Sequence, residues 1–100
     1  MGQEQGGGWV YIMANRYRGT IYVGVTSDLA DRIAHHRDGK GSAFCAEHAL
    51  NRLVWAEKIE RIDEAIAREK RLKRWRREWK FDLIEKNNPD WRDLFGDLNR

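Results

Sequence analysis

Two short apolar runs near the start of the chain predict its first structural unit. Residues 10–13 and 20–24 are rich in β-branched and aromatic side chains, and a polar segment that ends in Gly19 separates them. Such runs predict two strands joined by a hairpin loop, with the glycine in the left-handed conformation. Because side chains alternate along a strand, Tyr11 and Tyr22 are expected to point to the same face of the hairpin.

The shared face of Tyr11 and Tyr22 has two interpretations. Two phenols beside Gly24, which lets a phosphate or another backbone come close, are typical of the floor of a binding site. A pair of half-buried core tyrosines has the same pattern. The hairpin by itself leaves both interpretations open.

The segment that follows the hairpin has the start and stop signals of a helix. Ser27 or Asp28 is expected to cap its N-terminus and Gly39 to end it. Arg32 and His36 lie one turn apart, at the edge of the apolar face, where they either reach a site on the sheet or lie at the surface. The predicted buried face consists of Leu29, Ala30, Ile33 and Ala34.

The next two segments are a predicted loop and a predicted third strand. Residues 40–50 contain turn-forming residues and predict a loop that Phe44 anchors to the core, with Cys45 as a small buried thiol. Residues 52–57 alternate between two apolar sets and predict a strand that is covered on both faces. The two sets are Leu53 with Trp55 and Val54 with Ala56.

An uninterrupted segment from residue 62 to about residue 86 predicts two helices with a break near Trp75. Asp63 is the expected N-cap of the first helix. Glu69 falls on the apolar face of that helix, and an unpaired buried carboxylate costs several kcal/mol. Glu69 therefore needs an arginine, a hydrogen-bond network or a metal ion. The apolar residues around it are Ile62, Ala65 and Ile66.

The C-terminal part of the chain contains one further predicted helix. Pro89 ends the preceding helix, because it disfavours the α conformation at Asn88. After it, apolar residues recur every three or four positions and predict a short helix that packs back onto the domain. These residues are Trp91, Leu94, Phe95 and Leu98.

Composition places these elements in one α+β domain, a small three-stranded antiparallel sheet flanked by helices. One hundred residues suffice for a single core, so we expect a disordered lead-in over 1–8 and one domain over 9–100. No apolar run approaches the roughly 20 residues of a membrane span, and the N-terminus does not have the pattern of a secretory signal. The single cysteine, Cys45, forms no intrachain disulfide, so a reducing, cytoplasmic setting is expected.

The net charge of +3 is modest, but many of the cations lie in one segment. Residues 68–80 carry eight cations, two glutamates and the indoles of Trp75 and Trp79. Such a segment either binds a phosphate backbone or forms a solvated helix face over two core tryptophans. On the first interpretation, the nucleic-acid-binding residues are Lys70, Lys73, Arg74, Arg76 and Arg77, with Arg16 and Arg18 of the hairpin loop.

The order of these motifs resembles the GIY-YIG nuclease superfamily, and the resemblance covers nearly everything from residue 9 to residue 98. The triplets at 9–11 and 22–24 stand where that family has GIY and YIG. The following helix, with Arg32 and His36, is similar to the arginine-bearing helix of the family. The segments LIEKNNPDWRDL and IYVGVTSDL most resemble those of small stand-alone bacterial members.

Two residues further along the chain also match the family. Glu69 matches the glutamate that binds the divalent cation, and Asn88 matches an asparagine near the end of the fold. One position departs from the pattern, because Trp9 replaces the first glycine of GIY.

The resemblance implies a metal-dependent endonuclease that hydrolyses DNA, whether branched, nicked or single-stranded. In this scheme Glu69 holds one Mg²⁺ or Mn²⁺ ion and Arg32 clamps the phosphate oxygens. Tyr11 or Tyr22 takes the proton from water, with His36 as a relay. Gly24 and Asn88 are expected to position the substrate.

Two other classes of function remain open from the sequence. Trp9 favours a nucleic-acid-binding module that has kept the fold without the catalysis. A protein-interaction domain is the third class, in which Glu69 pairs with Arg32 and the tyrosines belong to the core.

Overall fold

The sheet at the centre of the fold has three strands, β1 (Gly8–Ala14), β2 (Ile21–Thr26) and β3 (Arg52–Ile59). The structure, a computed structural model, describes residues 7–40 and 42–99. Strand β1 lies in the middle and pairs antiparallel with both neighbours, so β2 and β3 form the edges. The predicted lead-in lies largely outside the described residues, and β1 already begins one residue before the expected boundary.

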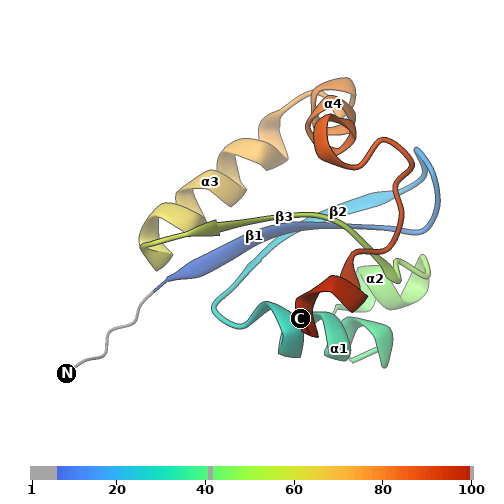
Figure 1. Cartoon of the computed structure of the whole chain (residues 1–100), viewed down its shortest axis with the longest axis horizontal. Coiled ribbons are helices and arrows are strands. Elements are labelled where there is room, and N and C mark those ends of the chain that lie inside the picture. Colours follow the sequence, from blue (N-terminus) through green and yellow to red (C-terminus); the bar gives the residue numbers. More distant parts are fainter. Residues whose placement is uncertain (1–6, 41, 100) are drawn as a thin grey trace.

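Helices cover both faces of this sheet (Figure 1). The helices are α1 (Leu29–Arg37), α2 (Ala43–Glu47), α3 (Ile62–Arg74) and α4 (Arg77–Asn87), followed by the 3₁₀ helix η1 (Phe95–Asn99). Helices α3 and α4 lie over one face, and α1, α2 and η1 lie over the other (Figure 1). The predicted α+β fold is confirmed. Within the described part of the chain, no helix is long and apolar enough to cross a membrane.

The central strand divides the core into two halves, as its alternating pattern predicts. Val10 and Ile12 pack under α3 and α4, whereas Tyr11 and Met13 pack against α1 and α2. All four side chains are fully buried. Burial of a large apolar side chain stabilises a fold by roughly 1.5–3 kcal/mol, so β1 is the main structural support of both halves.

Strand β3 departs from the predicted alternation. Ile12 pairs with Trp55 while the next residue of β1, Met13, pairs with Leu53, so Val54 is an extra residue in β3. This β-bulge turns Val54 and Trp55 to the same side, in the core beneath α3 and α4. The prediction of two strictly alternating sets is therefore wrong at this point.

The hairpin loop uses its glycine differently from the prediction. Arg18, with φ 52°, takes the left-handed conformation that was expected of Gly19. Gly19 is needed for space, because a Cβ there would overlap the side-chain oxygen of Asn15. That oxygen accepts a hydrogen bond from the Thr20 backbone N–H at 3.0 Å and closes the loop.

The limits of α1 agree with its signals, but its buried face does not. The Asp28 side chain caps the helix, and Gly39 follows it with φ 77°. Ala30 and Ala34, which were predicted to be buried, are exposed, and His36 is buried instead. The helix is therefore rotated about its axis toward the imidazole.

Helix α3 ends where predicted but begins without the expected cap. Its N-cap is Arg61, without a side-chain cap, and Asp63 lies inside the first turn. The break after Arg74 and the end of α4 at Asn87 are confirmed. The side chains of Ile62 and Ile66 are each more than one third exposed, so the buried face of α3 is narrower than its helical periodicity predicts. It consists of Ala65, Glu69 and Leu72.

Two connecting segments differ from their predictions. The loop over 40–50 contains the short helix α2, and Cys45 rather than Phe44 anchors it, because Phe44 is 43% exposed. Near the C-terminus, Trp91 lies in the core beneath α4 and is not part of a terminal helix. The 3₁₀ helix begins only at Phe95 and packs on the opposite face of the sheet.

Candidate active site

Tyr11 and Gly24 face each other across the pairing of β1 with β2. The phenol ring of Tyr11 lies directly over the glycine, and a Cβ at Gly24 would stand 2.5 Å from the ring. The expectation that Gly24 makes room for a substrate is corrected here. The space beside this glycine holds Tyr11.

Tyr11 joins two side chains of α1 through its hydroxyl group. The hydroxyl lies 3.0 Å from Nε2 of His36 and accepts a hydrogen bond of 3.3 Å from Nε of Arg32. Burial raises the pKa of Tyr11 to about 12, although the hydrogen bond from Arg32 opposes this shift. Tyr11 is therefore a neutral phenol near pH 7.

His36 is a buried imidazole and not the group at the border of core and solvent that the sequence predicts. It is 2% exposed, and burial, together with the charge of Arg32, lowers its pKa. Because Arg32 donates to the Tyr11 oxygen, we infer that the phenol hydrogen points to Nε2 of His36, which leaves Nδ1 protonated. Nδ1 has no hydrogen-bond partner in the part of the chain that the structure describes.

Tyr22 is the half-exposed member of the tyrosine pair. The two phenol rings lie 6.4 Å apart on the same face of the sheet, as predicted. The Tyr22 ring also lies 5.7 Å from the ring of His36 and 6.3 Å from that of Phe44 in α2. Of the four side chains of Tyr11, Tyr22, Arg32 and His36, those of Tyr22 and Arg32 are partly exposed to solvent and the other two are buried.

Glu69 approaches the same strand edge from the other side of the sheet. It is 8% exposed, and its carboxylate forms an ion pair of 2.6 Å with Lys73, one turn further along α3. This hydrogen bond raises the pKa of Lys73, and its ammonium lies 5.9 Å from the centre of the Tyr22 ring. The partner that Glu69 requires is therefore a lysine. Among the described residues, the ion pair of Glu69 is with Lys73, whereas Arg32 donates to Tyr11, so the alternative pairing of Glu69 with Arg32 is not formed.

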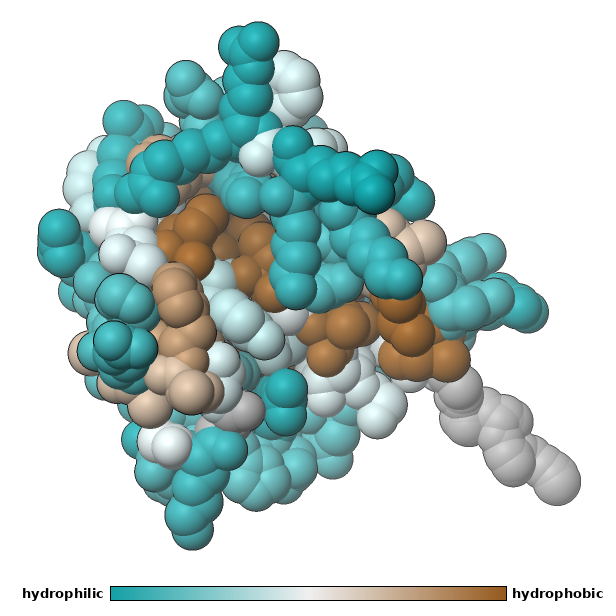
Figure 2. All heavy atoms as spheres, turned by 180° about the vertical axis from the view of Figure 1, so that it is seen from behind, coloured by the Kyte–Doolittle hydropathy of each residue, from teal (hydrophilic) through white to brown (hydrophobic). Residues whose placement is uncertain are grey.

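Strand β2 forms one edge of the sheet, with a helical layer on each side of it (Figure 1). Viewed from behind, this face shows an apolar area bordered above and below by hydrophilic side chains (Figure 2). Tyr22 comes from β2 itself, Arg32 from α1 on one side, and Lys73 from α3 on the other. An anionic ligand at this edge would meet a cation from each layer.

The donor set at this edge fits a divalent cation of the magnesium type. Among the described residues, no group of three or more histidine, cysteine, aspartate or glutamate side chains is close enough to hold a metal. A single carboxylate, completed by water and phosphate oxygens, is ordinary for Mg²⁺ and is unlike the full protein shell of structural zinc. Glu69 fits this requirement once its carboxylate is released from Lys73.

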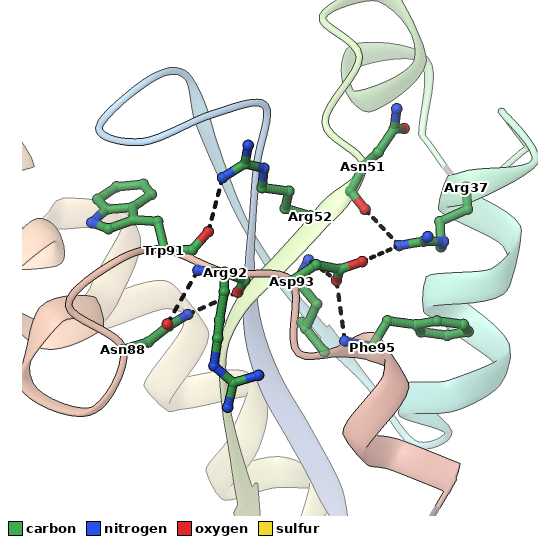
Figure 3. A network of polar contacts seen from close by, with 9 residues as sticks. Arg37, Asn51, Arg52, Asn88, Trp91, Arg92, Asp93 and Phe95 are labelled. Atoms are coloured by element: carbon green, nitrogen blue, oxygen red, sulfur yellow. Dashed lines mark hydrogen bonds and ion pairs between the residues drawn. The ribbon is translucent and has the colours of Figure 1, made fainter.

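Asn88 has a structural role in place of the predicted contact with substrate. Its side-chain amide donates to the carbonyl of Val54 at 3.0 Å. The amide also donates to the carbonyl of Arg92 at 2.9 Å, and the side-chain oxygen accepts from the Arg92 N–H (Figure 3). The bond to Val54 ties the end of α4 to β3, and the two bonds with Arg92 hold the segment that follows α4. None of them reaches the tyrosines.

Asp93 continues this structural network, and the sequence patterns did not single it out. Its carboxylate accepts from the backbone of Leu53 and of Phe95 and from the guanidinium of Arg37 in α1 (Figure 3). The C-terminal segment therefore links β3 to the helix that carries Arg32. An acidic residue in a turn has no periodic signal, so its role is visible only in three dimensions.

Besides Lys73, which pairs with Glu69, two of the predicted nucleic-acid-binding cations are engaged within the chain. Arg18 forms a bidentate pair with Glu85, at 2.8 and 2.7 Å, and Arg77 donates to the backbone of Gly19 at 2.7 Å. These contacts hold the hairpin loop against α4, which corrects their expected role. The other cations with exposed side chains are Arg16, Lys70, Arg74 and Arg76, together with Lys73.

The turn between α3 and α4 carries an aromatic pair. Trp79 is 51% exposed, packs edge-to-face with the half-buried Trp75, and has the guanidinium of Arg76 5.5 Å from its ring centre. The expectation of two core tryptophans is therefore wrong for Trp79. An exposed indole among cations is typical of a surface that contacts nucleic acid.

Fold and site together define a small α+β domain with a tyrosine, arginine and histidine cluster at one sheet edge. The family described as the GIY-YIG catalytic domain matches residues 7–82 of the chain. The chain belongs to the GIY-YIG family, whose domain is characteristic of endonucleases. The matched region includes both tyrosines and ends before Asn88.

The chain is also similar to individual bacterial proteins. The chain is 30% identical over 79 residues to a UPF0213 protein of Streptococcus pneumoniae serotype 4, which covers 79% of each chain. It is 32% identical over 77 residues to a UPF0213 protein of Staphylococcus haemolyticus, covering 77% of this chain and 93% of the relative. The solution NMR structure of a UPF0213 protein from Bacillus halodurans is similar, with 29% identity and a TM-score of 0.52, covering 82% of this chain and 86% of that one.

Proposed function

We propose that this protein is a divalent-metal-dependent endonuclease that hydrolyses phosphodiester bonds in DNA. The observation that supports the proposal is the position of Lys73. It pairs with the nearly buried carboxylate of Glu69, and its ammonium lies 5.9 Å from the ring centre of Tyr22, which packs beside Tyr11 and His36. The membership of the chain in the GIY-YIG family supports the same chemistry.

The two tyrosines have different surroundings, and we assign them different roles. Tyr11 is fully buried, with a pKa of about 12, and its hydroxyl is already shared by Arg32 and His36. It is therefore a positioning residue. We assign the contact with the attacking water, and the acceptance of its proton, to Tyr22, because its phenol is the one that reaches solvent.

Arg32 is suited to hold the reacting phosphate. Its Nε is occupied by the Tyr11 hydroxyl, which fixes the plane of the guanidinium and leaves the terminal nitrogens for the non-bridging oxygens. Donors held in advance stabilise the negative charge that develops at phosphorus. His36 contributes by keeping the Tyr11 hydroxyl, and through it Arg32, in place.

Glu69 is the residue that would hold one Mg²⁺ or Mn²⁺ ion. When bound, such an ion polarises the phosphoryl group and stabilises the departing 3′ oxygen. The carboxylate is nearly buried and comes from the middle of a thirteen-residue helix, so its position is rigid. A rigid ligand favours the well-defined geometry that Mg²⁺ requires.

The substrate strand is expected to follow the basic face of α3 and the start of α4. Lys70, Arg74 and Arg76 have exposed side chains there, and Arg16 extends the positive charge onto the hairpin loop. The exposed indole of Trp79 adds a surface for an unpaired base. We therefore propose branched, nicked or single-stranded DNA as the substrate class.

A cleavage assay with matched variants tests the proposal. The wild-type protein is incubated with branched, nicked and single-stranded DNA in Mg²⁺ or Mn²⁺. Glu69→Gln is expected to abolish cleavage, whereas Glu60→Gln, which alters an exposed carboxylate outside the site, leaves it unchanged. Glu69→Gln cleaving DNA as fast as the wild type would refute the metal role. For Arg32→Ala, loss of affinity with an intact single-turnover rate would reduce Arg32 to a binding contact.

A nucleic-acid-binding module without catalysis is the second candidate, and one observation favours it. Trp9, at the position of the first motif glycine, is a partly buried indole that packs on the same face as Tyr11. This candidate predicts salt-sensitive DNA binding without cleavage under any metal condition. Because Trp9 is the departure that favours this candidate, restoring the motif with Trp9→Gly is expected to produce cleavage that the wild type does not show.

A further inference from the structure

The carboxylate that the proposed function assigns to a metal ion already has a cation. The Nζ of Lys73 lies 2.6 Å from Oε2 of Glu69, a distance typical of a strong charge-assisted hydrogen bond. The Glu69 side chain is 11% exposed while that of Lys73 is 50% exposed. The acid is thus held rigidly, and its lysine partner reaches it from solvent.

A divalent cation and the Lys73 ammonium compete for Oε2 of Glu69. Mg²⁺ binds a carboxylate oxygen at about 2.0–2.1 Å, so an ion on Oε2 would lie within a few ångströms of Nζ. Two positive charges at that distance repel strongly where water is scarce. Binding of the ion to this oxygen therefore requires Lys73 to leave it.

A second partner for the Lys73 ammonium is available at this edge of the sheet. Its side chain is flexible and half-exposed, and its ammonium already lies 5.9 Å from the ring centre of Tyr22, at the opening of the site. A phosphodiester held by Arg32 at the same edge would lie between the two helical layers. A displaced ammonium from α3 can then pair with an oxygen of that strand.

We propose that Lys73 is a positioning residue that exchanges partners. It holds Glu69 in place before the metal arrives, and it moves to a phosphate of the DNA when the ion takes the carboxylate. This inference rests on the proposed function. It implies that metal and DNA bind cooperatively, because each favours the conformation in which Lys73 has left Glu69, and such coupling is reciprocal.

Titration of the free protein with Mn²⁺, followed by electron paramagnetic resonance or calorimetry, tests the exchange without any turnover. Lys73→Met removes the competing charge and is expected to tighten Mn²⁺ binding about three- to tenfold. Lys73→Arg keeps a cation and is expected to stay near the wild type. Lys86→Met is the control, since Lys86 is an exposed lysine of α4 outside the proposed site, and its effect is expected to be less than twofold.

A second measurement addresses the other half of the exchange. The affinity for a phosphorothioate-substituted single-stranded oligonucleotide is measured with and without Mn²⁺. Mn²⁺ is expected to tighten binding by the wild type, and Lys73→Met is expected to lose most of this gain, with a salt dependence that is shallower by about one phosphate contact.

The outcomes separate this inference from the function on which it rests. Mn²⁺ binding that Glu69→Gln abolishes, but that Lys73→Met and Lys86→Met affect equally, would overturn the exchange and leave the metal site intact. Mn²⁺ binding that does not depend on Glu69 in any variant would overturn the metal site itself, and the exchange with it. Thermal melting of each variant confirms that the fold is retained.

Discussion

Replacement of Tyr11 by phenylalanine tests the hydrogen-bonded cluster most directly. The change removes one oxygen from the centre of the site and leaves the ring over Gly24 in place. It breaks the contact of 3.0 Å to His36 and the contact of 3.3 Å from Arg32. The imidazole, whose Nδ1 already has no partner among the described residues, then loses the partner of its other nitrogen as well.

The expected cost follows from this loss. A buried polar group without a partner costs about 1–3 kcal/mol, so Tyr11→Phe is expected to lower the free energy of unfolding by about 2 kcal/mol. Urea denaturation followed by circular dichroism measures this difference. Tyr17→Phe is the matched control, because Tyr17 is exposed in the hairpin loop, and its effect is expected to stay within about 0.5 kcal/mol.

A double-mutant cycle with His36→Leu separates the hydrogen bond from the ring. If the two groups interact as described, the cost of Tyr11→Phe falls by about 1 kcal/mol once the imidazole is gone. If Tyr11→Phe lowers the free energy of unfolding equally with and without His36→Leu, or lowers it in neither case, the proposed interaction is refuted. Tyr22→Phe provides a contrast, since we expect it to reduce cleavage with little effect on stability.

Three further predictions concern neighbouring features. Burial lowers the pKa of His36, so the folded state favours the neutral ring. The resulting stability is present above the unfolded pKa of about 6.5 and is lost as the pH falls below it. His36→Leu is expected to remove this loss, which urea titrations between pH 7 and 5 measure. Gly24→Ala places a methyl group against the ring of Tyr11 and is expected to cost about 1–3 kcal/mol of unfolding free energy, and a melting temperature equal to that of the wild type would contradict the close contact. Trp79→Ala is expected to weaken binding of single-stranded DNA by about five- to tenfold in fluorescence anisotropy, with Tyr17→Ala as the control, and equal effects of the two would show that the indole contributes no stacking.

Much of the scaffold follows from local patterns in the sequence. The alternation in β1 and β2 predicts that Tyr11 and Tyr22 share a face, because the period of a strand leaves no other choice. The signals at Asp28 and Gly39 mark the limits of α1 correctly, since capping depends on a few adjacent residues. Helical periodicity also predicts that Glu69 lies on an apolar face and needs a partner.

The depth of the site depends on contacts between distant parts of the chain. The basic segment groups Lys73 with the DNA-binding cations, and although its spacing of four residues from Glu69 on one helix allows the pair, only the packing of α3 against β2 brings its ammonium beside Tyr22. The sequence places His36 at a helix edge, because a helical wheel gives the angle between side chains and not the rotation of the helix against its neighbours. Asn88 matches a motif position, yet its side chain donates to the carbonyl of Val54 in β3, 34 residues away in the sequence.

The sequence by itself therefore determined which residues share a face, where most helices end and which carboxylate is out of place. The tertiary structure decided which of these residues meet, which are buried and which cations remain free. The physical reason is that strand and helix periodicity acts over a few residues. Burial and pairing depend instead on how the two helical layers pack on β1. The bulge at Val54 shows that one inserted residue suffices to move a side chain from one face of the sheet to the other.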